Sequence, residues 1–141
     1  MKYRELIAAA YEARKASYSP YSGYRVGAAL LCADGKIYTG CNIENAAYTP
    51  TVCAERTAFF KAVSEGVRNF EAIAIVGSPA GEPVQFAWPC GVCRQVMMEF
   101  CDPKQFIVIV AKSEEEYEQR TLKELLPQGF GPENLGGAER S

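Results

Sequence analysis

The pattern that most constrains this chain is a set of cysteines that stand far apart in the sequence. Cys53 precedes Glu55 by two residues, Cys90 and Cys93 follow Pro89, and the 141 residues include no histidine. Three thiolates in this pattern can bind one zinc ion and leave its fourth position open for water, as in catalytic zinc sites. The fold must therefore bring together two segments that lie far apart along the chain.

Length and composition indicate one ordinary globular domain. A chain of 141 residues buries roughly two thirds of its unfolded surface, which is enough for a core without covalent staples. We expect a single domain over residues 1–141, in which residues 128–141, rich in glycine, proline and charge, form a C-terminal arm.

The charge and the hydropathy of the chain limit the kinds of molecule that it is expected to bind. The formal net charge is −2 and lysines and arginines are not clustered, which argues against a nucleic acid polymer because phosphate affinity depends on basic side chains. A small, uncharged or weakly charged molecule is favoured instead. No apolar run approaches the roughly 20 residues that span a bilayer, and the first residues do not resemble a signal peptide. We therefore expect a cytoplasmic protein with no membrane partner, whose reduced cysteines favour metal binding or catalysis over disulfides.

Hydrophobic periodicity predicts helices that alternate with strands after an opening hairpin. The expected helices cover residues 2–16, 52–64, 89–100 and 122–126, with Pro89 at the first helical position. The expected strands cover residues 24–32, 36–41, 71–76, 105–111 and, more weakly, 117–122. Residues 17–23, 42–51 and 78–88 are expected to be loops. This order predicts an α/β domain with a mixed sheet.

Both cysteine motifs fall where a loop leads into a helix, so we expect Cys53, Cys90 and Cys93 in first helical turns. Three thiolates on Zn²⁺ leave a net charge near −1, which the positive ends of two helices stabilise. Arg56 is the nearby fixed cation and can hydrogen-bond the ligand sulfurs from outside the zinc's own shell. Glu55, not itself a ligand, can take a proton from the zinc's water and pass it to a ring nitrogen and a departing amine.

Two other interpretations of the cysteines stay open at this point. A Cys-x-x-Cys pair at a helix start is also found in thioredoxin-type redox proteins, although that interpretation gives Cys53 and Glu55 no purpose. A structural zinc site would need a fourth ligand, for which Cys32, Cys41 and Cys101 are available by count. The simpler expectation is that these three are buried as small hydrophobic residues.

Several longer motifs give the chain a resemblance to a known family. They are residues 21–29, residues 40–46, the segment VCAERTA at 52–58, the segment PCGVCRQ at 89–95 and residues 124–127. Together they are similar to the small homotetrameric cytidine deaminases, over nearly the whole chain from about Glu5 to Leu135. The cysteine and glutamate pattern alone indicates only the zinc-dependent deaminase superfamily.

The resemblance implies a three-layer α/β/α sandwich around a five-stranded mixed sheet, with one Zn²⁺ per subunit. It implies conversion of cytidine and deoxycytidine to uridine and deoxyuridine with release of ammonia, as in pyrimidine salvage. Asn42 and Glu44 would hold the ribose hydroxyls, Tyr24 would line the pyrimidine ring, and groups near Ala54 would contact its edge.

The same resemblance implies a homotetramer with shared active sites. Phe130, and Tyr48 with it, would reach the active site of an adjacent subunit. The chain departs from the family at Tyr24, where phenylalanine is common, and at Trp88, which replaces a small residue. Two alternatives remain: a deaminase of the same fold for another aminated heterocycle such as blasticidin S, and a zinc-stapled interaction module without turnover.

Overall fold

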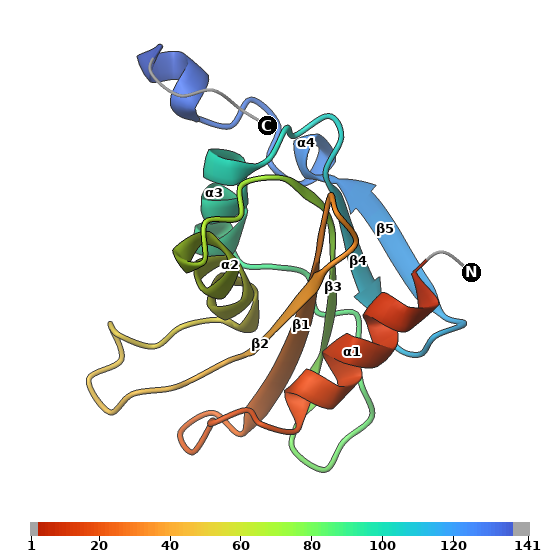
Figure 1. Ribbon diagram of the computed structural model, residues 1–141. Helices are drawn as coiled ribbons and strands as arrows, with labels where there is room; N and C mark the ends of the chain where they lie inside the picture. The colour runs from red at the N-terminus through yellow and green to blue at the C-terminus, as the bar shows by residue number, and fades with distance from the viewer. Residues whose placement is uncertain (1–2, 137–141) are drawn as a thin grey trace.

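A five-stranded sheet of strand order β2-β1-β3-β4-β5 forms the centre of the computed structural model, which describes residues 3–136 (Figure 1). The strands are β1 (Tyr24–Cys32), β2 (Ile37–Cys41), β3 (Phe70–Pro79), β4 (Ile107–Ala111) and β5 (Tyr117–Thr121). β3 and β4 pair in parallel, whereas β1–β2, β1–β3 and β4–β5 pair antiparallel. The predicted α/β class and the mixed five-stranded sheet are thus confirmed.

Helices cover both faces of this sheet and give the expected three layers. α1 (Arg4–Arg14) lies on one face, and α2 (Ala54–Ser64) and α3 (Gly91–Phe100) lie side by side on the other (Figure 1). A short α4 (Leu122–Leu125) follows β5 directly, and a 3-10 helix, η1 (Pro132–Leu135), lies within the C-terminal segment. Residues 137–141 of the expected arm lie outside the described residues.

Two hydrophobic cores lie on the two faces of the sheet. Beneath α1, Leu6, Ile7 and Ala10 pack on small side chains of the sheet, among them Ala74. On the opposite face, Phe59 of α2 belongs to the core that holds the cysteine-bearing helix starts. This second core fixes α2 and α3 relative to each other and to β1 and β3, and so sets the distance between their first turns.

Several element boundaries differ from the sequence prediction, among them the starts of α2 at Ala54 instead of residue 52 and of β4 at Ile107 instead of residue 105. α1 ends at Arg14 instead of residue 16, because the chain turns there so that the Tyr18 N–H can bond the Asn42 carbonyl. β3 runs on to Pro79, although residues 78–88 were expected to be a loop. Pro89 does not open a helix: Cys90 is the N-cap of α3 and the first helical residue is Gly91.

Among residues 3–136, no helix is both long enough and apolar enough to cross a lipid bilayer.

Candidate active site

Two helix N-termini carry the cysteines. Cys53 is the N-cap of α2 and Cys90 the N-cap of α3, each with extended backbone, while Cys93 lies in the first turn of α3. The N-cap carbonyls accept the first helical hydrogen bonds, from Thr57 and Arg94. The prediction of first-turn positions is therefore right for Cys93 and one residue off for the other two, whose sulfurs face the positive ends of two helix dipoles.

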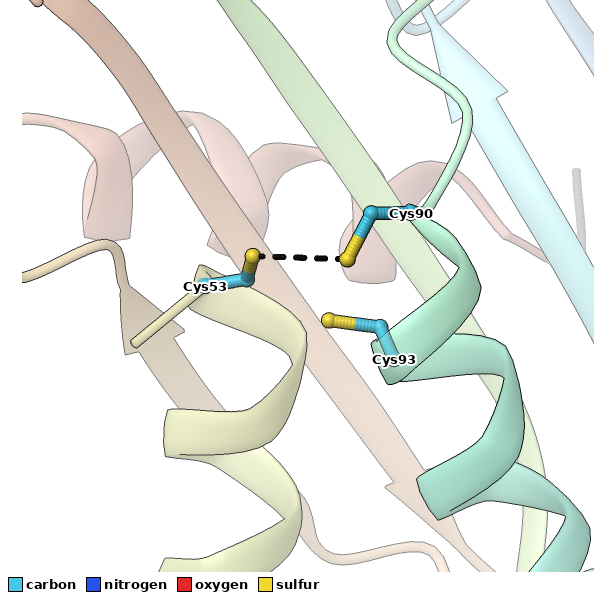
Figure 2. A group of neighbouring side chains, drawn as sticks. All are labelled: Cys53, Cys90 and Cys93. Atoms are coloured by element: carbon cyan, nitrogen blue, oxygen red, sulfur yellow. Dashed lines mark hydrogen bonds between the residues drawn. The ribbon is translucent and has the colours of Figure 1, made fainter. Parts of the chain in front are cut away.

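The three sulfurs converge at one point between the helices (Figure 2). Cys53 Sγ and Cys90 Sγ lie 3.7 Å apart, and all three sulfurs lie within 4.8 Å of one another. Tetrahedral zinc with Zn–S bonds of about 2.3 Å needs sulfurs about 3.8 Å apart. The cysteine set therefore fits zinc with three protein ligands, and within residues 3–136 no further histidine, cysteine, aspartate or glutamate joins it.

Arg56 supplies the positive charge that three thiolates require. Its Nη2 donates to Cys53 Sγ at 3.4 Å. Hydrogen bonds from Cys93 and Arg56 to the Cys53 sulfur lower the pKa of Cys53 to about 5, against the opposing effect of burial. The Nε of Arg56 is buried and has no hydrogen-bond partner in the described residues, so this guanidinium is oriented mainly by the sulfurs.

Glu55 follows Cys53 by two residues in the sequence, and its side chain is buried in the fold. Its side chain is 4% exposed, and burial raises the pKa of Glu55 to about 7, with the charge of Cys53 adding to the rise. Gly40 of β2 lets the first turn of α2 approach this closely: a Cβ at Gly40 would lie 2.5 Å from the Ala54 carbonyl oxygen and 2.6 Å from the Ala58 nitrogen.

A cavity of about 390 Å³ opens beside the cysteines. Cys53, Cys90 and Glu55 line it, and so do Asn42, Glu44 and Tyr24. The structure thus brings the predicted catalytic residue, two predicted zinc ligands and three predicted substrate-binding residues to one cavity. Cys93 is 1% exposed and is therefore the buried member of the cysteine group.

Asn42 and Glu44 are both held in place by hydrogen bonds. Asn42 donates to the Tyr24 carbonyl at 2.8 Å and accepts from the Val26 N–H at 2.9 Å. Glu44 Oε1 accepts from the N–H groups of Tyr21 and Ser22, and Oε2 accepts from the Ser22 hydroxyl. These bonds, with that of the Ser22 hydroxyl first, lower the pKa of Glu44. Both side chains therefore present fixed polar atoms to the cavity.

Three predicted substrate-contacting residues do not line this cavity. Ala54, at the first position of α2, is fully buried. Tyr48 is 74% exposed and lines a neighbouring hollow of about 370 Å³ that shares Glu44 with the first. Phe130 is 58% exposed, and its carbonyl accepts a hydrogen bond of 2.8 Å from Gln95 of α3.

Sequence reasoning missed several apolar residues of the cavity wall, and it noticed Trp88 only as a departure from the family. Val26, Ile75 and Ala87 line the cavity together with Trp88. Val26 and Ile75 belong to strands and read as ordinary core positions, so no local signal marked them. Ala87 and Trp88 precede the Pro-Cys pair, and that proximity was the available signal.

The fold and this site define a zinc-dependent hydrolytic enzyme: an α/β/α domain with three thiolates at two helix starts and a buried glutamate at the same cavity. The chain belongs to the cytidine and deoxycytidylate deaminase family, whose zinc-binding region matches residues 1–110.

Relatives extend over nearly the whole chain. The cytidine deaminase of Sporosarcina psychrophila is 51% identical over 138 residues, which is 98% of each chain. A probable cytidine deaminase of Dictyostelium discoideum is 44% identical over 92% of this chain and 84% of its own. The crystal structure of cytidine deaminase from Burkholderia pseudomallei superposes with a TM-score of 0.80 at 43% identity, covering 92% of this chain and 100% of that chain.

Proposed function

We propose that this protein hydrolyses cytidine and deoxycytidine to uridine and deoxyuridine and releases ammonia, a reaction of pyrimidine salvage. The observation that carries the proposal is that Glu55, Cys53 and Cys90 line a single cavity. The chain belongs to the deaminase family. In zinc-dependent deaminases, zinc activates a water that attacks the aminated ring carbon, and a glutamate transfers the protons.

Cys53, Cys90 and Cys93 would hold the zinc, which when bound acts as a Lewis acid and makes water easier to deprotonate. Glu55 accepts the proton of that water and delivers a proton to ring N3, which makes C4 electrophilic. The water oxygen forms a bond to C4, and the bond from C4 to the exocyclic nitrogen breaks. Glu55 then takes the remaining proton of that oxygen and passes it to the exocyclic nitrogen, which departs as ammonia while the C4 carbonyl forms. One positioned carboxylate thus serves each proton transfer.

Binding of the nucleoside is assigned to other residues of the cavity wall, Asn42, Glu44 and Tyr24. Glu44 keeps acceptor capacity beyond its three bonds because a carboxylate has about four lone-pair sites, so it accepts from a ribose hydroxyl. The Asn42 amide nitrogen has a second hydrogen to donate to a ribose oxygen. Tyr24 lies against the pyrimidine ring, and the backbone near Ala54 contacts the ring edge. Polar contacts and acid–base chemistry in one cavity fit a nucleoside-sized substrate.

The active assembly is proposed to be a homotetramer in which subunits share active sites. Phe130 and Tyr48 support this assignment, because both are large and exposed and neither lines the cavity of its own chain. Tyr48 has a φ of 46°, a left-handed backbone that an ordinary residue adopts at a cost and that is often retained at functional sites. In this assembly both side chains would complete the cavity of a neighbour.

Turnover by the purified protein tests the proposal. Zinc-loaded protein is expected to convert cytidine to uridine, to lose activity on chelation and to regain it when zinc is returned. Glu55→Gln is expected to retain zinc, measured by metal analysis, and to lose at least ~10²–10⁴-fold in kcat. Glu65→Gln, at the other end of α2, is the matched control and should keep its activity. Zinc-loaded wild-type protein without uridine formation would contradict the proposed function.

A further inference from the structure

Part of the cavity wall next to the cysteines is formed by a segment that hydrogen bonds hold near both of its ends. This segment, residues 84–89, lies between β3 and α3. Its Gln85 N–H bonds the Gly77 carbonyl of β3 at 2.8 Å, and its Pro89 carbonyl accepts from Arg94 Nε at 2.7 Å. Trp88 lies between these two anchors and lines the cavity with Cys90 and Glu55.

Trp88 is also held from the outside by a cation. The guanidinium carbon of Arg120, on β5, lies 5.6 Å from the Trp88 ring centre, within the range of about 6 Å in which a cation is attracted to an aromatic face. Arg120 itself is restrained by Glu118, with 3.6 Å between Nη2 and Oε1. These contacts favour the orientation in which the indole lines the cavity.

The position of this surface bears on one edge of the substrate. The reacting carbon, C4, must lie near the cysteine group and Glu55, and it has N3 on one side and C5 on the other. Glu55 serves the N3 side in the proposed reaction. The C5 side must then face another part of the wall near the cysteines; Ala87 and Trp88 line the cavity and directly precede Pro89 and Cys90 in the chain.

We propose that Trp88, positioned by Arg120, is a specificity determinant that rejects cytidines carrying a bulky group at C5. The proposal rests on the proposed function, since it concerns which cytidines that site accepts. A packed pocket discriminates one added methyl-sized group by roughly 10- to 200-fold. Bulkier C5 substituents should therefore be excluded while Trp88 is in place.

Kinetics on cytidine, 5-methylcytidine and 5-iodocytidine test the wall itself. In wild-type protein, kcat/KM is expected to fall in that order. Trp88→Ala should raise kcat/KM for 5-iodocytidine relative to cytidine by about tenfold or more, and Trp88→Phe should lie between. A variant that is merely destabilised loses activity on all three substrates alike. An unchanged ratio in both variants would overturn the proposal.

A second pair of variants tests the role of Arg120. Arg120→Gln should shift the substrate ratio in the same direction as Trp88→Ala, but less. Lys112→Gln is the matched control, because Lys112 lies 4.7 Å from the ring centre of Phe86 in the same segment and does not line the cavity. It should leave the ratio unchanged. If Arg120→Gln and Lys112→Gln changed the substrate ratio equally, Arg120 would have no specific role in positioning Trp88.

Fluorescence gives a readout that does not depend on turnover. Trp88 is the only tryptophan of the chain, so its emission reports on this wall alone. Arg120→Gln should make the emission easier to quench with acrylamide, and Lys112→Gln should not. If wild-type protein fails to turn over cytidine, the proposed function fails, and quenching by nucleosides still decides the present inference. Binding of 5-iodocytidine as tight as that of cytidine would then contradict it.

Discussion

Arg56 is a positively charged side chain that, together with the N-termini of α2 and α3, balances the negative charge of the cysteines. Three thiolates make zinc a weaker Lewis acid than three histidines would, because they return electron density to the ion. Arg56 opposes this effect through its hydrogen bond to Cys53 Sγ. It draws charge out of the sulfur and favours the thiolate form that binds metal. Its role is thus to tune the centre without touching the substrate.

Arg56→Gln is accordingly expected to lower kcat by about 10- to 100-fold while most of the zinc is retained. Steady-state kinetics and metal analysis on the same preparation check this expectation. Arg68→Gln is the control, since Arg68 donates only to carbonyls near the end of α2, those of Val63 and Val67. Full activity in Arg56→Gln would rule out charge compensation at Cys53.

The Ser22 hydroxyl affects the pH range over which Glu44, the proposed ribose contact, stays ionised. Its hydrogen bond is the largest cause of the lowered pKa of Glu44, so the carboxylate stays ionised as the pH falls. Ser22→Ala should raise that pKa, and KM for cytidine should begin to rise at a higher pH than in wild type, with little change at neutral pH. KM measured against pH tests this. In a Glu44→Gln background, Ser22→Ala should produce no shift of the profile.

At the scale of the elements, the approach of α2 to β2 places the catalytic residues of the cavity. Gly40 has no room for a side chain because backbone atoms of Ala54 and Ala58 lie against it. Gly40→Ala must push back the turn that carries Cys53 and Glu55, at a cost of about 1–3 kcal/mol or more. We expect a lower Tm and weaker zinc retention. Gly91→Ala, beside Cys90 but with nothing within 4 Å of a new Cβ, should keep both.

The sequence was sufficient to predict which elements exist, but it misplaced ends that depend on tertiary pairing. Pro79 seemed to exclude a strand, because proline cannot donate to a ladder. In the structure, β3 pairs with β1 as far as Tyr24 and Pro79, while its pairing with β4 stops at Ile75. Proline is tolerated where only one neighbour remains. No local pattern reveals which strands surround a position, and this explains the error.

The candidate site also contains residues that the sequence predicts and residues that it does not. Cys53, Glu55, Cys90 and Cys93 were predictable because ligands and a proton carrier have fixed chemical requirements and compact motifs. The apolar wall was not, because Val26 and Ile75 reach the cavity only through the packing of the sheet against α2 and α3. Their side chains satisfy the same hydrophobic pattern whether they face a core or a substrate.

At the scale of the whole molecule, a single chain leaves large aromatic surfaces uncovered. Besides Tyr48 and Phe130, exposed apolar side chains include Phe60 of α2 and Val92 of α3. Gln95 of α3 holds the backbone at Phe130, and the phenyl side chain is exposed. An exposed hydrophobic surface of this kind marks a protein contact, and here the proposed partner is another copy of the chain.

Mixing two inactive variants tests whether the partner completes the site. Phe130→Ala is expected to keep Glu55 and zinc yet lose activity, because its neighbours' cavities lack the ring. Glu55→Gln keeps Phe130 and lacks the proton carrier. If Phe130 acts across the interface, assemblies formed by unfolding and refolding the two together contain some sites with both groups. Cytidine turnover should therefore return to a measurable fraction of the wild-type rate, and light scattering should show tetramers. If Phe130 served its own chain, no mixture could contain an intact site, and activity would not return.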